Sequence, residues 1–253
     1  MERCLFLPKA LLLDLDDTIL SFSAGAEAAW EMVCRHFCER TSVPFSQEDL
    51  YRHVISCRDW YWSDSDRHKS GREHINQARR EIMRNALEEL GFIDSALSDE
   101  AADEYSDIRE ASMYLFDGAL EALESFRKMG IQLGLVTNGG SLIQRKKLAR
   151  FDLEKYFHEI LIDQEIGVSK PDQAVYELAL QRLHVSADEV IMVGDNLVWD
   201  ILGAQRAGIY AVWNDYLREG LPLSSTIHPD HTVTSIWELS KRFESITSLR
   251  HEK

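Results

Sequence analysis

The sequence has little of what builds a membrane protein, a disulfide framework or a nucleic-acid-binding surface. No apolar run approaches the roughly 20 residues of a membrane-spanning helix, and the apolar stretch after Met1 is too short for a signal peptide. The four cysteines lie in the first quarter of the chain without CxxC spacing, so we expect free thiols. With 28 Lys and Arg against 43 Asp and Glu, the net charge of −15 is a poor match to nucleic acid. These absences predict a cytoplasmic protein that binds neither a membrane nor a nucleic-acid polymer.

The second half of the chain alternates short apolar runs with amphipathic segments, and 45% of all residues are hydrophobic. Such runs are typical of parallel strands that are buried on both faces and joined by right-handed helical crossovers. The predicted strands are Ala10 to Leu15, Ile131 to Thr137, Glu159 to Ile162, Val190 to Gly194, Ile209 to Trp213 and His231 to Val233. The predicted helices of this part are Ala119 to Met129, Ser141 to Phe151, Gln173 to Leu183 and Trp199 to Ala207. The pattern predicts an α/β fold, a Rossmann-like core with a doubly wound parallel sheet.

Residues 21–116 differ, because they show helical periodicity and no comparable buried strand. The predicted helices run over Ala24 to Glu39, Gln47 to Trp60, Arg72 to Leu90 and Asp99 to Tyr114. We therefore expect an α-helical cap at 21–116, inserted into a core domain formed by 1–20 and 117–253.

Two aspartates separated by one residue, Asp14 and Asp16, follow the first predicted strand. Side chains of an extended chain alternate between faces, so both carboxylates project from one side. Two acids placed together repel unless a cation offsets their charge, and Mg²⁺ binds such oxygen ligands. A surface turn after a buried strand is the alternative interpretation of this motif alone.

Polar residues also follow the next predicted strands, at the edge where an open α/β sheet places its ligand crevice. Thr137, Asn138 and Gly139 offer a hydroxyl, an amide and a backbone that can approach a phosphate, although an ordinary Asn-Gly turn has the same pattern. Lys170, directly before Pro171, is a cation that could offset Asp14 and a phosphate; a solvated surface lysine is the alternative.

The last of these patches is Gly194-Asp195-Asn196, with Asp200 five residues beyond Asp195. Asp195 is suited to complete a magnesium site with Asp14. Asp200 could accept hydrogen bonds near that site, or could only favour the N-terminus of its own helix.

In chain order, the four patches resemble the four motifs of the haloacid dehalogenase (HAD) superfamily. They are Asp14-Leu15-Asp16-Asp17-Thr18, Thr137-Asn138, Lys170-Pro171 and Gly194-Asp195 through Asp200. The resemblance covers essentially the whole chain and implies a Rossmann-like core with a helical cap between the first two motifs. One departure is Asp117-Gly118, where many relatives carry Pro-Gly at the return to the core.

This resemblance implies that Asp14 is a nucleophile that forms an aspartyl-phosphate and that Asp16 acts first as acid and then as base. It implies Mg²⁺ held by Asp14, the Asp16 backbone carbonyl and Asp195, with Asp200 supporting them. The implied phosphate-binding residues are Thr137, Asn138, Gly139 and Lys170. The predicted function is a magnesium-dependent phosphatase, a cytoplasmic hydrolase acting on a small phosphorylated metabolite.

Other activities of the same superfamily are alternatives. A phosphomutase would protect its aspartyl-phosphate from water, which the sequence does not decide. A dehalogenase needs no magnesium and typically lacks the second aspartate, which is present here as Asp16. A catalytically silent HAD-like binding protein would have no need for so many like charges in one cluster.

Substrate choice is expected to lie in the cap, which would close over the leaving group. The cap candidates form an aromatic and basic segment that comprises Trp60, Trp62, Arg67, His68 and Arg72. Packing between helices is the alternative role for these side chains, and we favour it. Cap size and motif forms look similar to N-acylneuraminate-9-phosphatases and pyrimidine 5'-nucleotidases, which predicts a sugar acid phosphate or a nucleotide as substrate. The protein is expected to be a monomer or a homodimer.

Overall fold

The computed structural model describes residues 4–251 and divides the chain into two compact units. The core unit contains the chain up to Ser21 and from Tyr114 onward, and the cap unit contains residues 22–113. We predicted the boundaries between core and cap at 20/21 and 116/117. They lie at 21/22 and 113/114 because β2 (Leu20–Ser21) and β3 (Tyr114–Leu115) pair antiparallel within the core unit.

The core unit is built on a parallel sheet with the strand order β5-β4-β1-β6-β7-β8 among the described residues. Its strands are β1 (Ala10–Leu13), β4 (Gln132–Thr137), β5 (Glu159–Ile162), β6 (Val190–Gly194), β7 (Tyr210–Asn214) and β8 (His231–Val233). From β1 the chain builds outward to β4 and β5, then crosses to β6 on the other side of β1. The predicted α/β class and doubly wound parallel sheet are confirmed. The chain adds strands first on one side of β1 and then on the other, so the topological switch point of the sheet lies at the end of β1.

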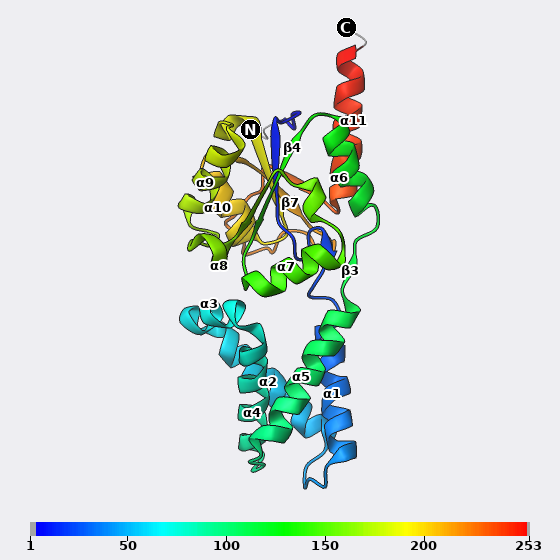
Figure 1. Cartoon of the computed structure of the whole chain (residues 1–253), viewed down its shortest axis with the longest axis vertical. Helices are drawn as coiled ribbons and strands as arrows, with labels where there is room; N and C mark the ends of the chain where they lie inside the picture. The colour runs from blue at the N-terminus through cyan, green and yellow to red at the C-terminus, as the bar shows by residue number, and fades with distance from the viewer. Residues whose placement is uncertain (1–3, 252–253) are drawn as a thin grey trace. The chain divides into compact units, whose positions relative to one another are not determined.

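Helices cover both faces of this sheet, with α9 and α10 on one side and α6 and α11 on the other (Figure 1). Ala10 and Leu12 of β1 pack on the side of α9 and α10, as the alternation of a strand requires. The α-helices of the core unit are α6 (Ala119–Lys128), α7 (Ser141–Arg150), α8 (Asp163–Ile166), α9 (Gln173–Leu183), α10 (Gly203–Arg206) and α11 (Ile236–His251). Short helical turns lie at η1 (Glu154–Tyr156) and η2 (Ala187–Glu189), and η3 (Leu197–Leu202) is a π-helical turn.

The helix predicted to start at Trp199 begins earlier, in η3. The Asn196 side chain is the reason, since its Oδ1 accepts hydrogen bonds from the backbone N–H groups of Val198 and Trp199. The N-terminal capping of η3 by Asn196 also fixes the position of Asp200, which lies inside this turn.

The cap unit is all-helical over its described residues, as predicted. Its helices are α1 (Ala26–Arg40), α2 (Gln47–Ser63), α3 (Ser65–Glu73), α4 (Ile75–Glu89) and α5 (Ser95–Ser112). The predicted helix starts at Arg72 and Asp99 were wrong. Arg72 lies in a separate helix, α3, which Asp64 caps, and α5 begins at Ser95 because Asp94 caps it. The cap core is apolar and aromatic, with Trp30 stacked on Tyr105 at 3.6 Å between ring centroids.

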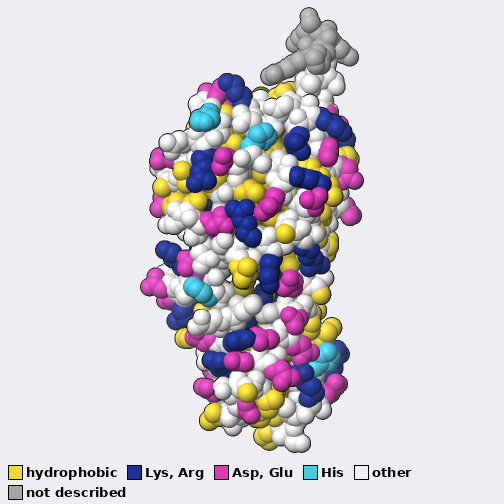
Figure 2. Space-filling model, viewed as in Figure 1, with side chains coloured by type: hydrophobic (Ala, Val, Ile, Leu, Met, Phe, Trp, Pro, Cys, Tyr) yellow, Lys and Arg dark blue, Asp and Glu magenta, His cyan; other side chains and the backbone are white. Residues whose placement is uncertain are grey.

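The four cysteines are free thiols, as predicted. Burial raises the pKa of Cys34 to about 12 and that of Cys57 to about 11, so these thiols stay protonated and pack as apolar groups. Among residues 4–251, no helix combines the length and the apolar character that crossing a bilayer requires. On the face shown in Figure 2, basic side chains lie among acidic ones over both units, so the negative charge is not gathered there in one patch.

Candidate active site

Three carboxylates converge where β1 and β6 end. The parallel pairing of Leu13 with Val193 brings the residues after both strands together, and the Asp14 N–H donates to the Val193 carbonyl at 3.0 Å. Asp14, Asp195 and Asp200 each present an oxygen within 4.8 Å of the others. Register and the capped turn η3 thus assemble an acidic cluster from segments far apart in sequence.

Lys170 is the cation of this cluster. Its Nζ donates to Asp14 Oδ1 and to Asp200 Oδ1, both at 2.6 Å, and its side chain is 2% exposed. Asn138 holds the Lys170 backbone through two reciprocal hydrogen bonds, since its Nδ2 donates to the Lys170 carbonyl and its Oδ1 accepts from the Lys170 N–H. The Asn138 side chain therefore positions Lys170.

Asp200 is held near Asp14 by contacts to both of its own oxygens. One accepts from Lys170, and the other accepts from the Asn196 N–H at 3.0 Å. These bonds fix both oxygens of Asp200 beside Asp14, and its supporting role at a metal site stays a prediction. Gly194 makes room for it, because a Cβ at Gly194 would lie 2.2 Å from Asp200 Cγ.

Replacing Gly194 with alanine is therefore expected to displace Asp200. Overpacking of this kind costs about 1–3 kcal/mol of unfolding free energy, and Lys170 would lose one of its two acidic partners. We expect denaturant titration to report the destabilisation and phosphatase assays to report lost activity. Gly220→Ala is the matched control, since no atom lies within 4 Å of a Cβ there, although its φ of +74° adds backbone strain. A Gly194→Ala protein as stable and active as the wild type would contradict the expectation.

The cluster holds more negative charge than Lys170 offsets. Burial, followed by the charges of Asp14 and Asp200, raises the pKa of Asp195 to about 9. Burial also raises the pKa of Asp14 to about 7, against the lowering effect of Lys170. Burial alone would lower the pKa of Lys170, but Asp14 and Asp200 raise it above its usual value. Hard oxygen ligands with uncompensated charge fit a divalent cation such as Mg²⁺.

These pKa shifts predict how magnesium and pH act together on stability. The pKa values of Asp14 and Asp195 are raised above the ordinary 3.8, so metal-free folded protein binds more protons than unfolded protein across about pH 4–9. Stability from these groups is then lost as pH rises through that range. Saturating Mg²⁺, at about 100 times its Kd, adds about 2.7 kcal/mol. We expect the Mg²⁺-induced rise in Tm to be larger at high than at low pH, and to shrink at both in Asp195→Asn.

Asp16 contacts two residues that sequence reasoning missed. Lys147 Nζ lies 2.7 Å from both Asp16 oxygens, and Gln144 Nε2 lies 3.1 Å from Oδ2. Both come from α7 and are buried, with Leu148, on its inner face. The sequence offers only a weak signal for them: positions 144, 147 and 148 have the spacing of one helix face, but nothing in the sequence shows that this face is the buried one.

The loop after β4 is tied to other parts of the core. Thr137 Oγ1 lies 2.6 Å from Gln144 Nε2, and the Gly139 N–H donates to Asp163 Oδ1 at 2.7 Å. Gly139 has φ +144°, a conformation that favours glycine. We predicted its N–H as a phosphate donor, but in this structure Asp163 accepts that hydrogen bond. Asp163 is a further residue of the site region that the sequence did not reveal.

The five predicted specificity residues of the cap lie on α2 and α3. The Arg67 guanidinium stacks 3.9 Å above the Trp60 ring, and its Nη2 donates to the Trp60 carbonyl at 2.7 Å. Trp62 packs edge-on against His68 at 5.2 Å, and burial followed by the charge of Arg72 lowers the pKa of His68. These contacts join α2 to α3, which agrees with packing as the favoured role. Their direct contact with substrate stays a prediction.

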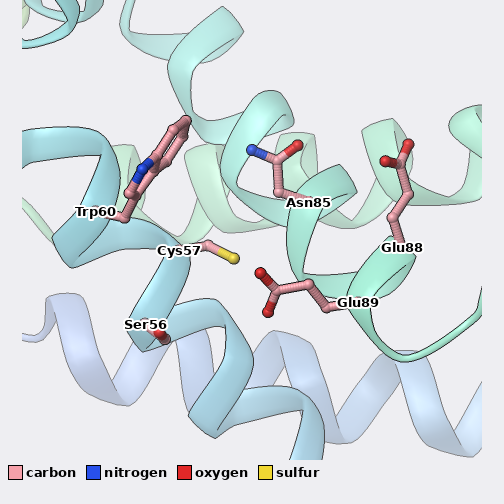
Figure 3. Close-up of a pocket in the computed structure, with 6 residues that line it drawn as sticks. All are labelled: Ser56, Cys57, Trp60, Asn85, Glu88 and Glu89. Atoms are coloured by element: carbon pink, nitrogen blue, oxygen red, sulfur yellow. The ribbon is translucent and has the colours of Figure 1, made fainter.

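A cavity of about 530 Å³ lies between α2 and α4 of the cap (Figure 3). Trp60 is the single predicted specificity residue among those that line it. The lining residues are Ser56, Cys57, Trp60, Asn85, Glu88 and Glu89. Two glutamates make this cavity a poor match to a phosphate ester or an anionic leaving group.

The core is a Rossmann-like, doubly wound parallel sheet that carries carboxylates and a buried lysine at its switch point, where folds of this class bind their ligands. The sequence profile of the haloacid dehalogenase-like hydrolases matches residues 8–208. The chain belongs to this family.

Curated relatives and solved structures agree with that assignment. The chain is 34% identical to a glyceraldehyde 3-phosphate phosphatase of Methanopyrus kandleri, over 81% of this chain and 82% of the relative. It is also 34% identical to a phosphoserine phosphatase of Thermus thermophilus, over 91% and 97%. The magnesium-bound HAD-hydrolase YfnB of Bacillus subtilis superposes with a TM-score of 0.68 at 25% identity, over 93% and 98%. Similar structures also include dehalogenases.

Proposed function

We propose that the protein is a magnesium-dependent phosphatase that hydrolyses a small phosphorylated metabolite through an aspartyl-phosphate on Asp14. The observation that carries the proposal is the contact of Asp14 with Lys170 beside Asp195 and Asp200, with Asp16 two residues further along the chain. Relatives named as phosphatases, which differ in substrate, support the activity and leave the substrate open.

Asp14 would attack the phosphorus with one carboxylate oxygen, breaking the bond between phosphorus and the leaving oxygen. Lys170, held through its backbone by Asn138, would neutralise charge on the nucleophile and the phosphoryl oxygens. Thr137 would donate to a phosphoryl oxygen from the next strand end. A bound Mg²⁺, held by Asp14, the Asp16 carbonyl and Asp195, would offset the charge of the phosphoryl group.

Asp16 would carry the proton in both halves of the reaction. It would give a proton to the leaving alkoxide, and as a carboxylate it would then take one from the water that attacks the aspartyl-phosphate. Hydrolysis returns inorganic phosphate and restores the Asp14 carboxylate. The cycle consumes one water and needs no other reactant.

Dehalogenase activity is the second candidate, because dehalogenases are among the similar structures. Asp16 argues against it, since dehalogenases of this family typically lack an acid two residues after the nucleophile. Halide release from short 2-haloacids, with no phosphate release from esters, would favour this alternative.

A panel of phosphate esters assayed with Mg²⁺ or with EDTA tests the proposal. We expect phosphate release from at least one member, and a loss of at least about 100-fold with EDTA, because charge at the phosphoryl group would be left unbalanced. The panel should include glyceraldehyde 3-phosphate, phosphoserine, a pyrimidine nucleotide and a sugar acid phosphate. The Asp195→Asn protein, purified in parallel, controls for contaminating phosphatase. No release from any ester would contradict the proposal and favour a binding role.

A further inference from the structure

We infer that Gln144 and Lys147 are positioning residues that fix the Asp16 side chain for proton transfer to the leaving group. The inference rests on the proposed phosphatase function and goes beyond it, because neither residue belongs to the four motifs. It predicts that the two residues matter most for esters whose leaving group needs a proton.

The geometry around Asp16 is that of a clamped carboxylate. Lys147 Nζ contacts both of its oxygens at 2.7 Å, and Gln144 Nε2 adds a third contact to Oδ2 at 3.1 Å. The two clamping residues are three positions apart on α7, so they project from one face of the helix. Three contacts from one rigid helix leave the carboxylate little freedom to rotate.

Gln144 also joins Asp16 to the strand end that is proposed to bind phosphate. The same Nε2 lies 2.6 Å from Thr137 Oγ1 and 3.3 Å from the Asn138 carbonyl, and the residue is 1% exposed. An amide nitrogen offers two hydrogens, so these contacts share its donors. The proton carrier and the phosphate loop are thus held by one side chain, which fixes their spacing.

Burial of Lys147 indicates that this contact is not incidental. The residue is 3% exposed, and taking an ammonium group out of water is costly unless a charged partner compensates it. Its neighbour Lys146 is exposed, as lysines usually are. Asp14 and Asp16 therefore each have a separate buried lysine, Lys170 for the proposed nucleophile and Lys147 for the proposed proton carrier.

Substrates with different leaving groups distinguish two roles for Gln144 and Lys147: positioning Asp16 for proton transfer, or only stabilising the fold. A p-nitrophenolate leaves as a stable anion, whereas the alkoxide of glycerol phosphate needs a proton as the bond breaks. The parameter kcat/KM reports steps up to the first irreversible one, which here is formation of the aspartyl-phosphate. Loose positioning of Asp16 should therefore lower kcat/KM for the alkyl ester far more than for the aryl ester.

The test measures kcat/KM for glycerol phosphate and p-nitrophenyl phosphate in Lys147→Met, with the exposed Lys146→Met as matched control. Loss of a supporting residue typically costs about 10- to 100-fold, and we expect that loss for the alkyl ester with a much smaller one for the aryl ester. Gln144→Met should give the same selectivity with a smaller loss. In an Asp16→Asn background, Lys147→Met should add little, because its target is already absent.

Equal losses on the two esters, or an undiminished loss in the Asp16→Asn background, would overturn the inference and leave the proposed function intact. The aryl ester also reports whether each variant is folded and retains its nucleophile. A wild-type protein that released phosphate from neither of these esters, nor from any ester of the substrate panel, would overturn the proposed function, and this inference with it.

Discussion

Replacing Asp14 with asparagine is expected to lower kcat by at least about 10⁴-fold, since removing the nucleophile of a covalent mechanism removes its central step. An amide is nearly isosteric with a carboxylate but cannot attack phosphorus. Its oxygen can still accept a hydrogen bond from Lys170, which contacts Asp14 Oδ1 at 2.6 Å. We therefore expect Asp14→Asn to fold like the wild type.

Three measurements check this expectation together. Phosphate release should vanish, mass spectrometry should detect a phosphorylated protein for the wild type but not for Asp14→Asn, and the two proteins should unfold at similar denaturant concentrations. Asp188→Asn, a change at an exposed position, is the matched control and should keep full activity. Substantial turnover by Asp14→Asn, after removal of contaminating phosphatase, would exclude Asp14 as the nucleophile.

The sequence predicts Asp14 and Asp195 as neighbours because strand ends are a strong local signal. Apolar runs locate β1 and β6, and parallel pairing brings the residues that follow them to one edge of the sheet. No residue count along the chain is needed for that inference, so the long stretch of sequence between Asp14 and Asp195 does not obscure it. Lys170 lies beyond α8 and not directly after β5, and its place in the site was expected from the resemblance of Lys170-Pro171 to a HAD motif.

Contacts made by helix faces and loop backbones are harder to predict. Lys147 follows Lys146 in the sequence with the same chemistry, and only the rotation of α7 about its axis decides which of the two is buried. The Gly139 N–H meets Asp163 across a loop whose path no periodicity encodes. In the cap, single capping residues such as Asp64 and Asp94 set where helices begin, and they start α3 and α5 several residues before the positions at which the apolar periodicity becomes clear.

Replacing Lys170 with methionine is expected to damage both stability and activity. Lys170 is the buried partner of Asp14 and Asp200, and removing one partner of a buried ion pair costs about 3–5 kcal/mol. Loss of a group that neutralises charge in phosphoryl transfer lowers kcat by about 10²- to 10³-fold. Denaturant titration and steady-state kinetics measure the two effects, and Lys146→Met is the matched control because that lysine is exposed.

The pH dependence distinguishes loss of this ion pair from loss of packing. Lys170 lowers the pKa of Asp14, which burial and Asp200 raise, so without Lys170 the folded-state pKa of Asp14 rises further above its unfolded value. A carboxyl group with a raised folded pKa contributes stability at low pH and loses it as pH rises through that pKa. The stability difference between wild type and Lys170→Met should therefore be smaller near pH 4, where Asp14 is protonated in both folded proteins, than near pH 8. A difference that stayed constant over this range would mean that the Lys170 side chain stabilises the fold by packing rather than through its charge.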